Sequence, residues 1–136
     1  MIIVLYYSTG SIYPALLAAL KHCYPALSPE QADLQAAGWL KEKIRDRRPP
    51  LLAVFGESSG GELVCLASVG VPPPLLERIL SSFGALLGNS PGAPTLLPAG
   101  PLPPTPRRQR GRNDFWREIE ARVERARLQL ELIGQR

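Results

Sequence analysis

The stretch Ile2-Ile3-Val4-Leu5-Tyr6-Tyr7, followed by Ser8-Thr9-Gly10-Ser11, decides the fold. A continuous apolar, β-branched and aromatic run of this length is typical of a strand covered on both faces in a parallel sheet. The polar loop ends the run, and apolar residues then recur at helical spacing as far as Cys23. Ser11 is a good N-cap, and Pro14 falls in the first turn, where a missing N–H costs little. The chain therefore opens with a predicted strand, a tight polar loop and a helix.

Two further strands are predicted at residues 51–55 and 62–68, which flank a polar, glycine-containing loop. Two apolar runs around a loop of this length are typical of a β-hairpin, so this pair is predicted to be antiparallel. The crossover from the first strand is predicted to be right-handed and to place the first and second strands parallel.

Further helices are predicted on capping and periodicity. The segment Ser28-Pro29-Glu30-Gln31 matches a capping box, which starts a helix over 29–37 that resumes after Gly38. Residues 75–87 are strongly amphipathic. The last predicted helix, residues 113–136, has one apolar stripe, which favours packing on the body over dimerisation through this helix. The stripe consists of Trp116, Ile119, Val123, Ala126, Leu130 and Ile133.

Proline divides the chain, because residues 89–106 are unusually rich in it. They predict an extended linker with at most a short edge strand near residues 95–97. We therefore expect an α/β core domain over 1–88, a Pro- and Arg-rich linker over 89–112, and a C-terminal amphipathic helix over 113–136 packed on the core. The predicted fold class is α/β, a small three-layer sandwich with a mixed sheet of three to four strands and helices on its faces.

Cysteine and histidine usage argues against a metal site. Cys23 and Cys65 have no CxxC spacing, and His22 is the single histidine among 136 residues. One histidine and two separated cysteines cannot form a four-ligand zinc site, so no metal and no cofactor are expected. The apolar start of the chain lacks a basic segment before it and is broken by polar residues, which predicts a cytoplasmic protein with no membrane partner.

The positive charge is concentrated at the end of the chain. Residues 107–136 hold nine arginines and five acidic residues, which accounts for the whole net charge of +4. Arg107, Arg108, Arg110 and Arg112 are therefore the candidate residues for contact with a partner. A solvated, arginine-rich helix entrance is favoured over specific nucleic-acid binding, because no recognition fold or interleaved aromatic set accompanies the arginines.

The first loop is the best candidate for ligand binding. A loop from a buried parallel strand into a helix presents backbone N–H groups at the positive end of the helix dipole, and such loops lie where ligands bind in open α/β sheets. An anion at this loop is the functional hypothesis, and an ordinary capped turn is the alternative. The candidate ligand-binding residues are Ser8, Thr9, Gly10, Ser11 and Tyr13.

No catalytic residue is predicted. His22 falls three turns away from Ser8 and Ser11, so it is expected to be a surface or packing residue rather than part of a hydrolytic triad. The hairpin residues Glu57 and Glu62, with the serines between them, are expected to form a solvated turn.

The residues Tyr6-Tyr7-Ser8-Thr9-Gly10-Ser11-Ile12-Tyr13-Pro14-Ala15, with the hairpin 54–64, resemble a domain-of-unknown-function family of small α/β proteins from spore-forming bacteria. That family opens with a strand and a Tyr-His-Cys-Tyr-Gly-Gly-x-His-Ser-Ser type of loop that enters an Ala-rich helix. Ser8 here replaces the cysteine of that pattern, and Tyr13 replaces its histidine. The resemblance implies the fold, whereas these two replacements remove the cysteine and the histidine on which any thiol or histidine chemistry of that family depends.

The function expected from the sequence is binding of an anionic or phosphorylated small molecule at the first strand–helix loop. One alternative is an enzyme, a transferase or hydrolase acting on a phosphorylated ligand, although no paired nucleophile and base is visible. Another is a module that contacts a protein or nucleic acid through the basic C-terminal segment.

Overall fold

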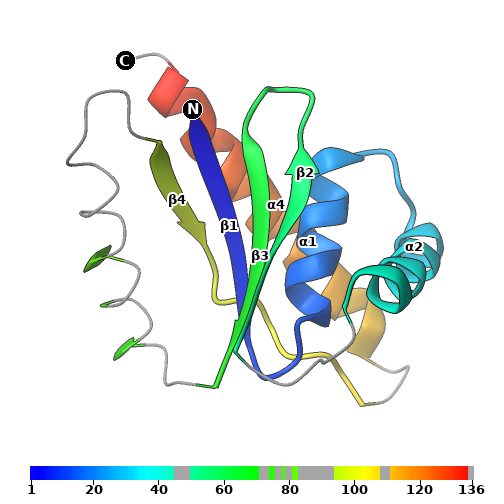
Figure 1. Ribbon diagram of the computed structural model, residues 1–136. Helices are drawn as coiled ribbons and strands as arrows, with labels where there is room; N and C mark the ends of the chain where they lie inside the picture. Colours follow the sequence, from blue (N-terminus) through cyan, green and yellow to red (C-terminus); the bar gives the residue numbers. More distant parts are fainter. Residues whose placement is uncertain are drawn as a thin grey trace.

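The computed structural model describes residues 1–44, 50–70, 74–75, 78, 81–82, 94–107 and 111–134. These residues form a four-stranded mixed sheet with three helices packed on one face (Figure 1), which confirms the predicted α/β class with a C-terminal helix. The strands are β1 (Ile2–Thr9), β2 (Leu51–Glu57), β3 (Leu63–Val69) and β4 (Thr95–Ala99), and the helices are α1 (Tyr13–Cys23), α2 (Pro29–Lys43) and α4 (Arg112–Gly134).

The strand order is β2-β3-β1-β4, with β1 parallel to both of its neighbours. The apolar run of β1 fits this central position, because both edges and both faces of the strand are covered. β2 and β3 are antiparallel, as the hairpin predicts. The prediction that the first and second strands are parallel is wrong, since the chain crosses from β1 to the edge of the sheet and the hairpin then returns β3, not β2, to the side of β1.

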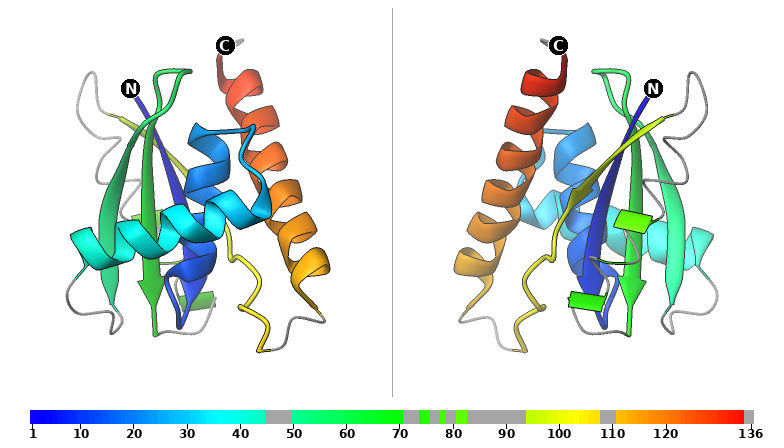
Figure 2. Two further views of the ribbon diagram at one scale, coloured as in Figure 1. Left: turned by 90° about the vertical axis from the view of Figure 1, so that its right-hand side faces the viewer. Right: turned by 90° about the vertical axis from the view of Figure 1, so that its left-hand side faces the viewer.

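The main core lies between the sheet and the helices. Val4 and Tyr6 of β1 face this core, whereas Leu5 and Tyr7 belong to a second apolar cluster on the opposite face. Tyr6 and Tyr7 therefore point to opposite faces of the sheet, as the two-residue period of a strand requires. α1 is buried along most of its length and has α2 on one side and α4 on the other (Figure 2). The helix predicted over 75–87 falls mostly outside the described residues.

The helix starts follow the sequence with one correction. Ile12, not Ser11, is the N-cap of α1, and the hydroxyl of Ser11 instead accepts a hydrogen bond of 3.1 Å from the Tyr13 N–H. The capping box at Ser28 is present as predicted. α2 continues through Gly38 without a break, because Ala36 and Leu40 on either side of the glycine are buried against the core.

β4 lies within the predicted linker and confirms the short edge strand expected there. The Thr95 N–H bonds to Met1, so alternate N–H groups of the strand, including the one that Pro98 lacks, face away from β1. The apolar stripe of α4 packs on α1, as predicted. Arg122 and Arg127 add hydrogen bonds from α4 to backbone carbonyls of Pro101 and of the last turn of α1. No helix in the described part of the chain has the length and apolar character needed to span a membrane.

Gly38 and Gly100 lie in different packing environments. A Cβ on Gly38 meets nothing within 4 Å, whereas a Cβ on Gly100 lies 2.7 Å from the carbonyl oxygen of Tyr7. We expect Gly38→Ala to raise the free energy of unfolding by about 0.5 to 1 kcal/mol, because alanine is the better helix former. We expect Gly100→Ala to lower it by roughly 1 to 3 kcal/mol through overpacking. Urea unfolding measures both changes, and equal effects of the two variants are the outcome that contradicts this assignment.

Candidate functional site

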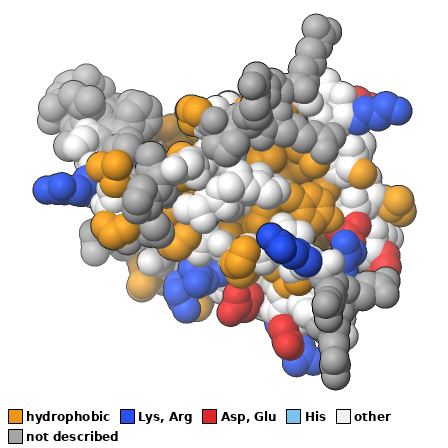
Figure 3. Space-filling view, turned by 90° about the horizontal axis from the view of Figure 1, so that it is seen from below, with side chains coloured by type: hydrophobic (Ala, Val, Ile, Leu, Met, Phe, Trp, Pro, Cys, Tyr) orange, Lys and Arg blue, Asp and Glu red, His pale blue; other side chains and the backbone are white. Residues whose placement is uncertain are grey.

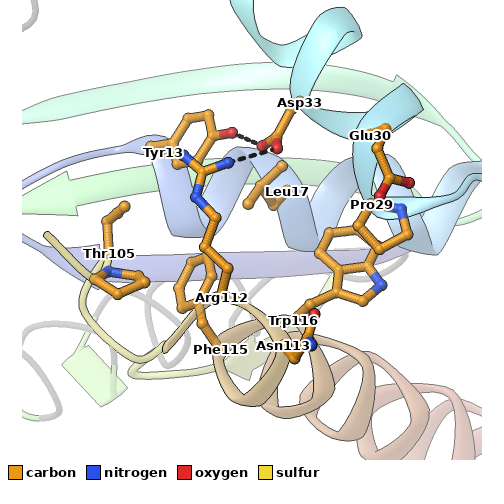
Figure 4. Close-up of a pocket in the computed structure, with 11 residues that line it drawn as sticks. Tyr13, Leu17, Pro29, Glu30, Asp33, Thr105, Arg112, Asn113, Phe115 and Trp116 are labelled. Atoms are coloured by element: carbon orange, nitrogen blue, oxygen red, sulfur yellow. Dashed lines mark hydrogen bonds and ion pairs between the residues drawn. The ribbon is translucent and has the colours of Figure 1, made fainter. Parts of the chain in front are cut away.

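A cavity of about 350 Å³ lies between the beginnings of α1, α2 and α4 (Figure 4). Its apolar lining comes from Leu17 of α1 and from Phe115 and Trp116 of α4, all of which are largely buried. Charged side chains of Glu30, Asp33 and Arg112 line it as well. The cavity thus combines apolar and aromatic walls with a few polar groups, which is the usual make-up of a small-molecule site.

The first residue of each described helix lines this cavity: Tyr13 of α1, Pro29 of α2 and Arg112 of α4. Each helix N-terminus has a positive partial charge from the summed peptide dipoles and presents N–H groups that lack intrahelical partners. Serine hydroxyls satisfy one of these N–H groups in α1 and one in α2. The first turns of three helices therefore border one hollow, an arrangement that no single stretch of sequence reveals.

Asp33 joins the three helices at the cavity. Its carboxylate accepts a hydrogen bond from the Tyr13 hydroxyl and an ion pair of 3.0 Å from Nη1 of Arg112, and Figure 4 shows both side chains pointing toward it. The side chains of Arg112 and Asp33 are 52% and 37% exposed. Solvent screens a pair of this kind, which stabilises a protein by only about 0 to 1 kcal/mol. Arg112 can therefore exchange Asp33 for another anion at low cost.

Thr105 is a further polar residue in the lining. Its Oγ1 atom is inaccessible to solvent and has no hydrogen-bond partner among the described residues. A buried hydroxyl without a partner costs on the order of 1 to 3 kcal/mol. This oxygen is thus a polar group beside the cavity whose hydrogen-bonding capacity is unused.

Ser8 and Gly10 of the first loop make hydrogen bonds within the protein. Ser8 is 1% exposed and donates a hydrogen bond of 2.6 Å to the Ser11 carbonyl, and the N–H of Gly10 bonds to Val69. Gly10 has a φ of 84°, a conformation that favours glycine. Thr9 and Ser11 are exposed. Among the five predicted ligand-binding residues, Tyr13 is the one that lines the cavity.

The structure separates the four candidate arginines. Arg112 lies at the cavity and Arg107 is exposed, whereas Arg108 and Arg110 fall outside the described residues. Figure 3 views the molecule from the end at which β1 finishes and shows acidic and basic side chains around an apolar area. The structure therefore brings Tyr13 and Arg112, which the sequence assigned to a ligand and to a partner, to a single site.

A second polar cluster lies at the other end of α1. Nδ1 of His22 is 2.6 Å from the Tyr6 hydroxyl, and its Nε2 is 2.7 Å from a carboxylate oxygen of Glu62. His22 is buried, in agreement with the predicted packing role. The prediction of a solvated turn is wrong for Glu62 and Ser58, because Glu62 bonds to His22 and Ser58 is buried beside it. The turn folds back on α1, and sequence spacing gave no signal of that contact.

Burial sets the protonation states of this Tyr6–His22–Glu62 array. Burial raises the pKa of the Tyr6 hydroxyl and lowers the pKa of His22, although the Glu62 hydrogen bond opposes the second shift. Burial also raises the pKa of Glu62, but hydrogen bonds from Ser58 and His22 outweigh it and lower that pKa overall. Tyr6 therefore donates to a neutral imidazole, which donates from Nε2 to the Glu62 carboxylate. The array fastens the hairpin turn to α1.

The remaining chemistry of the described residues is limited. Burial raises the pKa of Cys23 to about 11, so its thiol stays protonated and weakly nucleophilic. No three His, Cys, Asp or Glu side chains in the described ranges lie close enough together to hold a metal ion.

Comparison with known proteins gives no match. No protein-family model matches the chain, and neither a curated protein nor a solved structure matches it. The resemblance of the first loop and hairpin to a bacterial α/β family thus stays a prediction.

The array predicts acid sensitivity. Because the folded-state pKa of His22 lies below its usual value of 6.5, the unfolded chain binds more protons, so stability is retained above pH 6.5 and falls as the pH drops below it. The lowered pKa of Glu62 acts in the same direction below pH 4.5. We expect the free energy of unfolding to decrease between about pH 7 and about pH 5.5, the range in which histidine titrates.

Urea unfolding across this pH range measures the effect. His22→Gln removes the titrating ring and is expected to flatten the pH dependence. Glu57→Gln changes an exposed hairpin carboxylate outside the array and is expected to preserve it. An unchanged pH profile in His22→Gln contradicts the assignment.

Proposed function

We propose that this protein binds a small organic anion in the cavity between α1, α2 and α4. The observation that supports this most is a cavity bordered by the first turns of three helices and lined by Arg112. Backbone dipoles and a guanidinium together favour a carboxylate or phosphate group. The proposed ligand class is the one expected from the sequence, and Tyr13 belongs to both the predicted loop and the cavity.

Arg112 is the residue proposed to contact the anionic group. Arg112 forms a solvent-exposed ion pair with Asp33. A ligand carboxylate or phosphate offers two oxygens to the planar guanidinium and so replaces one weak ion pair by a bidentate contact. Asp33 then keeps the hydrogen bond from Tyr13.

The rest of the ligand is proposed to be apolar. Leu17, Phe115 and Trp116 form the buried part of the lining, and a volume of about 350 Å³ lies in the range of known small-molecule pockets. An aliphatic or aromatic group placed there leaves water and gains roughly 25 cal/mol per Å² of apolar surface buried.

Binding rather than catalysis is the function that the lining supports best. The described lining holds two carboxylates: Asp33 accepts bonds from Tyr13 and Arg112, and Glu30 has no hydrogen bond to a hydroxyl or thiol of another described residue. The transferase or hydrolase alternative thus has no observation in its favour at this cavity.

Arg112→Gln tests the proposal directly. We expect this variant to weaken the binding of phenyl phosphate and phenylpropionate by roughly tenfold or more, because a charge-assisted hydrogen bond contributes about 1.5 to 3 kcal/mol. Isothermal titration calorimetry measures the affinities. Arg117→Gln is the matched control, since Arg117 is an exposed arginine of the same helix outside the cavity lining. Equal affinities in the two variants contradict the proposal, and a loss confined to Thr9→Val places the anion at the first loop instead.

Asp33→Asn tests the exchange of partners at Arg112. Asparagine still accepts a hydrogen bond from Tyr13 but no longer neutralises the guanidinium. We expect phenyl phosphate to bind up to about fivefold more tightly, the factor that corresponds to the removal of a competing ion pair of about 1 kcal/mol. Weaker binding of the anion in this folded variant is the result that speaks against the exchange.

A further inference from the structure

Glu30 is a charged residue of the cavity lining that has no role in the binding of a simple anion. It lies in the first turn of α2, is exposed, and has no hydrogen bond or ion pair with any other described residue. Figure 4 shows Glu30 on the side of Trp116, whereas Arg112 lies on the side of Tyr13. The two opposite charges thus lie at different parts of one cavity lining.

The charges of the lining do not match a ligand that is only negative. Among the described residues of the lining, Glu30 and Asp33 against Arg112 give a formal excess of one negative charge. A carboxylate or phosphate at Arg112 displaces Asp33 and binds in a cavity that Glu30 also lines. Both carboxylates therefore repel the anion. A positive group on the same ligand removes this conflict.

The two carboxylates of the lining, Glu30 and Asp33, are neighbours on α2. Glu30 and Asp33 are three residues apart in α2, and side chains at this spacing are neighbours about 5 to 6 Å apart at Cβ. Arg112 contacts Asp33, so an anion that takes the place of Asp33 at Arg112 binds beside the same part of α2 that carries Glu30. Such a spacing suits a molecule whose ammonium and carboxylate are attached close together.

We propose that the ligand is zwitterionic, an α-amino acid with an apolar or aromatic side chain; this inference rests on the proposed function. Arg112 binds the carboxylate, and Glu30 binds the ammonium. Trp116, which Figure 4 shows on the same side of the cavity as Glu30, adds a cation–π attraction for the ammonium. Leu17 and Phe115 receive the side chain of the ligand.

Three probes that share one aromatic ring separate the contributions. Phenylalanine has both charges, phenylpropionate has the carboxylate alone, and phenethylamine has the ammonium alone. By titration calorimetry on the full chain we expect phenylalanine to bind roughly tenfold or more tightly than either of the others, because it makes two charge-assisted contacts instead of one.

Glu30→Gln identifies the ammonium site. In this variant we expect the affinity for phenylalanine to fall to about that of phenylpropionate, and the affinity for phenylpropionate itself to stay equal or rise, because a repulsive carboxylate is lost. Glu42→Gln is the control, since Glu42 is an exposed acidic residue near the other end of the same helix and outside the cavity lining. It is expected to leave all three affinities unchanged.

The outcomes separate this inference from the proposed function. Phenylpropionate that binds as tightly as phenylalanine, or phenylalanine that binds Glu30→Gln as well as the unaltered protein, overturns the zwitterion and leaves the anion site in place. If phenyl phosphate binds and phenylalanine does not, the zwitterion is likewise overturned and the anion site stays in place. Tightest binding of phenethylamine, or binding of no anion at all, overturns both.

Discussion

The packing of α4 on α1 is the contact on which the candidate site depends. The start of α4 supplies Phe115 and Trp116 to the cavity, and Arg127 farther along α4 bonds to backbone carbonyls in the last turn of α1. The two helices are therefore joined at both ends of α1. The residue pairs that meet across this interface are about a hundred positions apart in the sequence. Such a site exists only after the whole chain has folded, because loops of that length must close before the contacts form.

Local patterns were sufficient for most of the elements. The apolar run of β1, the Ser28 capping box, the hairpin and the stripe of α4 each depend on neighbours within a few residues, and each has the predicted structure. What failed was strand order, because the sequence does not state which strand of a hairpin lies next to β1. The N-cap of α1 shifted by one residue for a smaller reason: the Ser11 hydroxyl reaches the N–H of Tyr13 without taking the cap position itself.

The site was predicted only in part for the same reason. Sequence alone indicated an anion near the start of the first helix and named both Tyr13 and Arg112, but in separate roles. It gave no sign that α2 also begins there, that Asp33 lies between them, or that Glu62 reaches His22. These contacts join different helices and strands. A sequence pattern describes the spacing of residues within one helix or strand, so it does not predict them. The same limit applies to Thr105, whose unpaired hydroxyl is defined by surroundings that come from other segments.

Pro98 has a consequence for how copies of this protein can associate. The sheet ends in β2 on one side and in β4 on the other, and the proline removes a donor from the outward side of β4. A filament that grows by strand addition needs an unpaired strand edge on both sides of every copy. A symmetric dimer needs one such edge, because the two-fold axis pairs that edge with its own copy. Among the described residues the two edges of this sheet are therefore unequal, and the β4 edge is the poorer one for adding a strand.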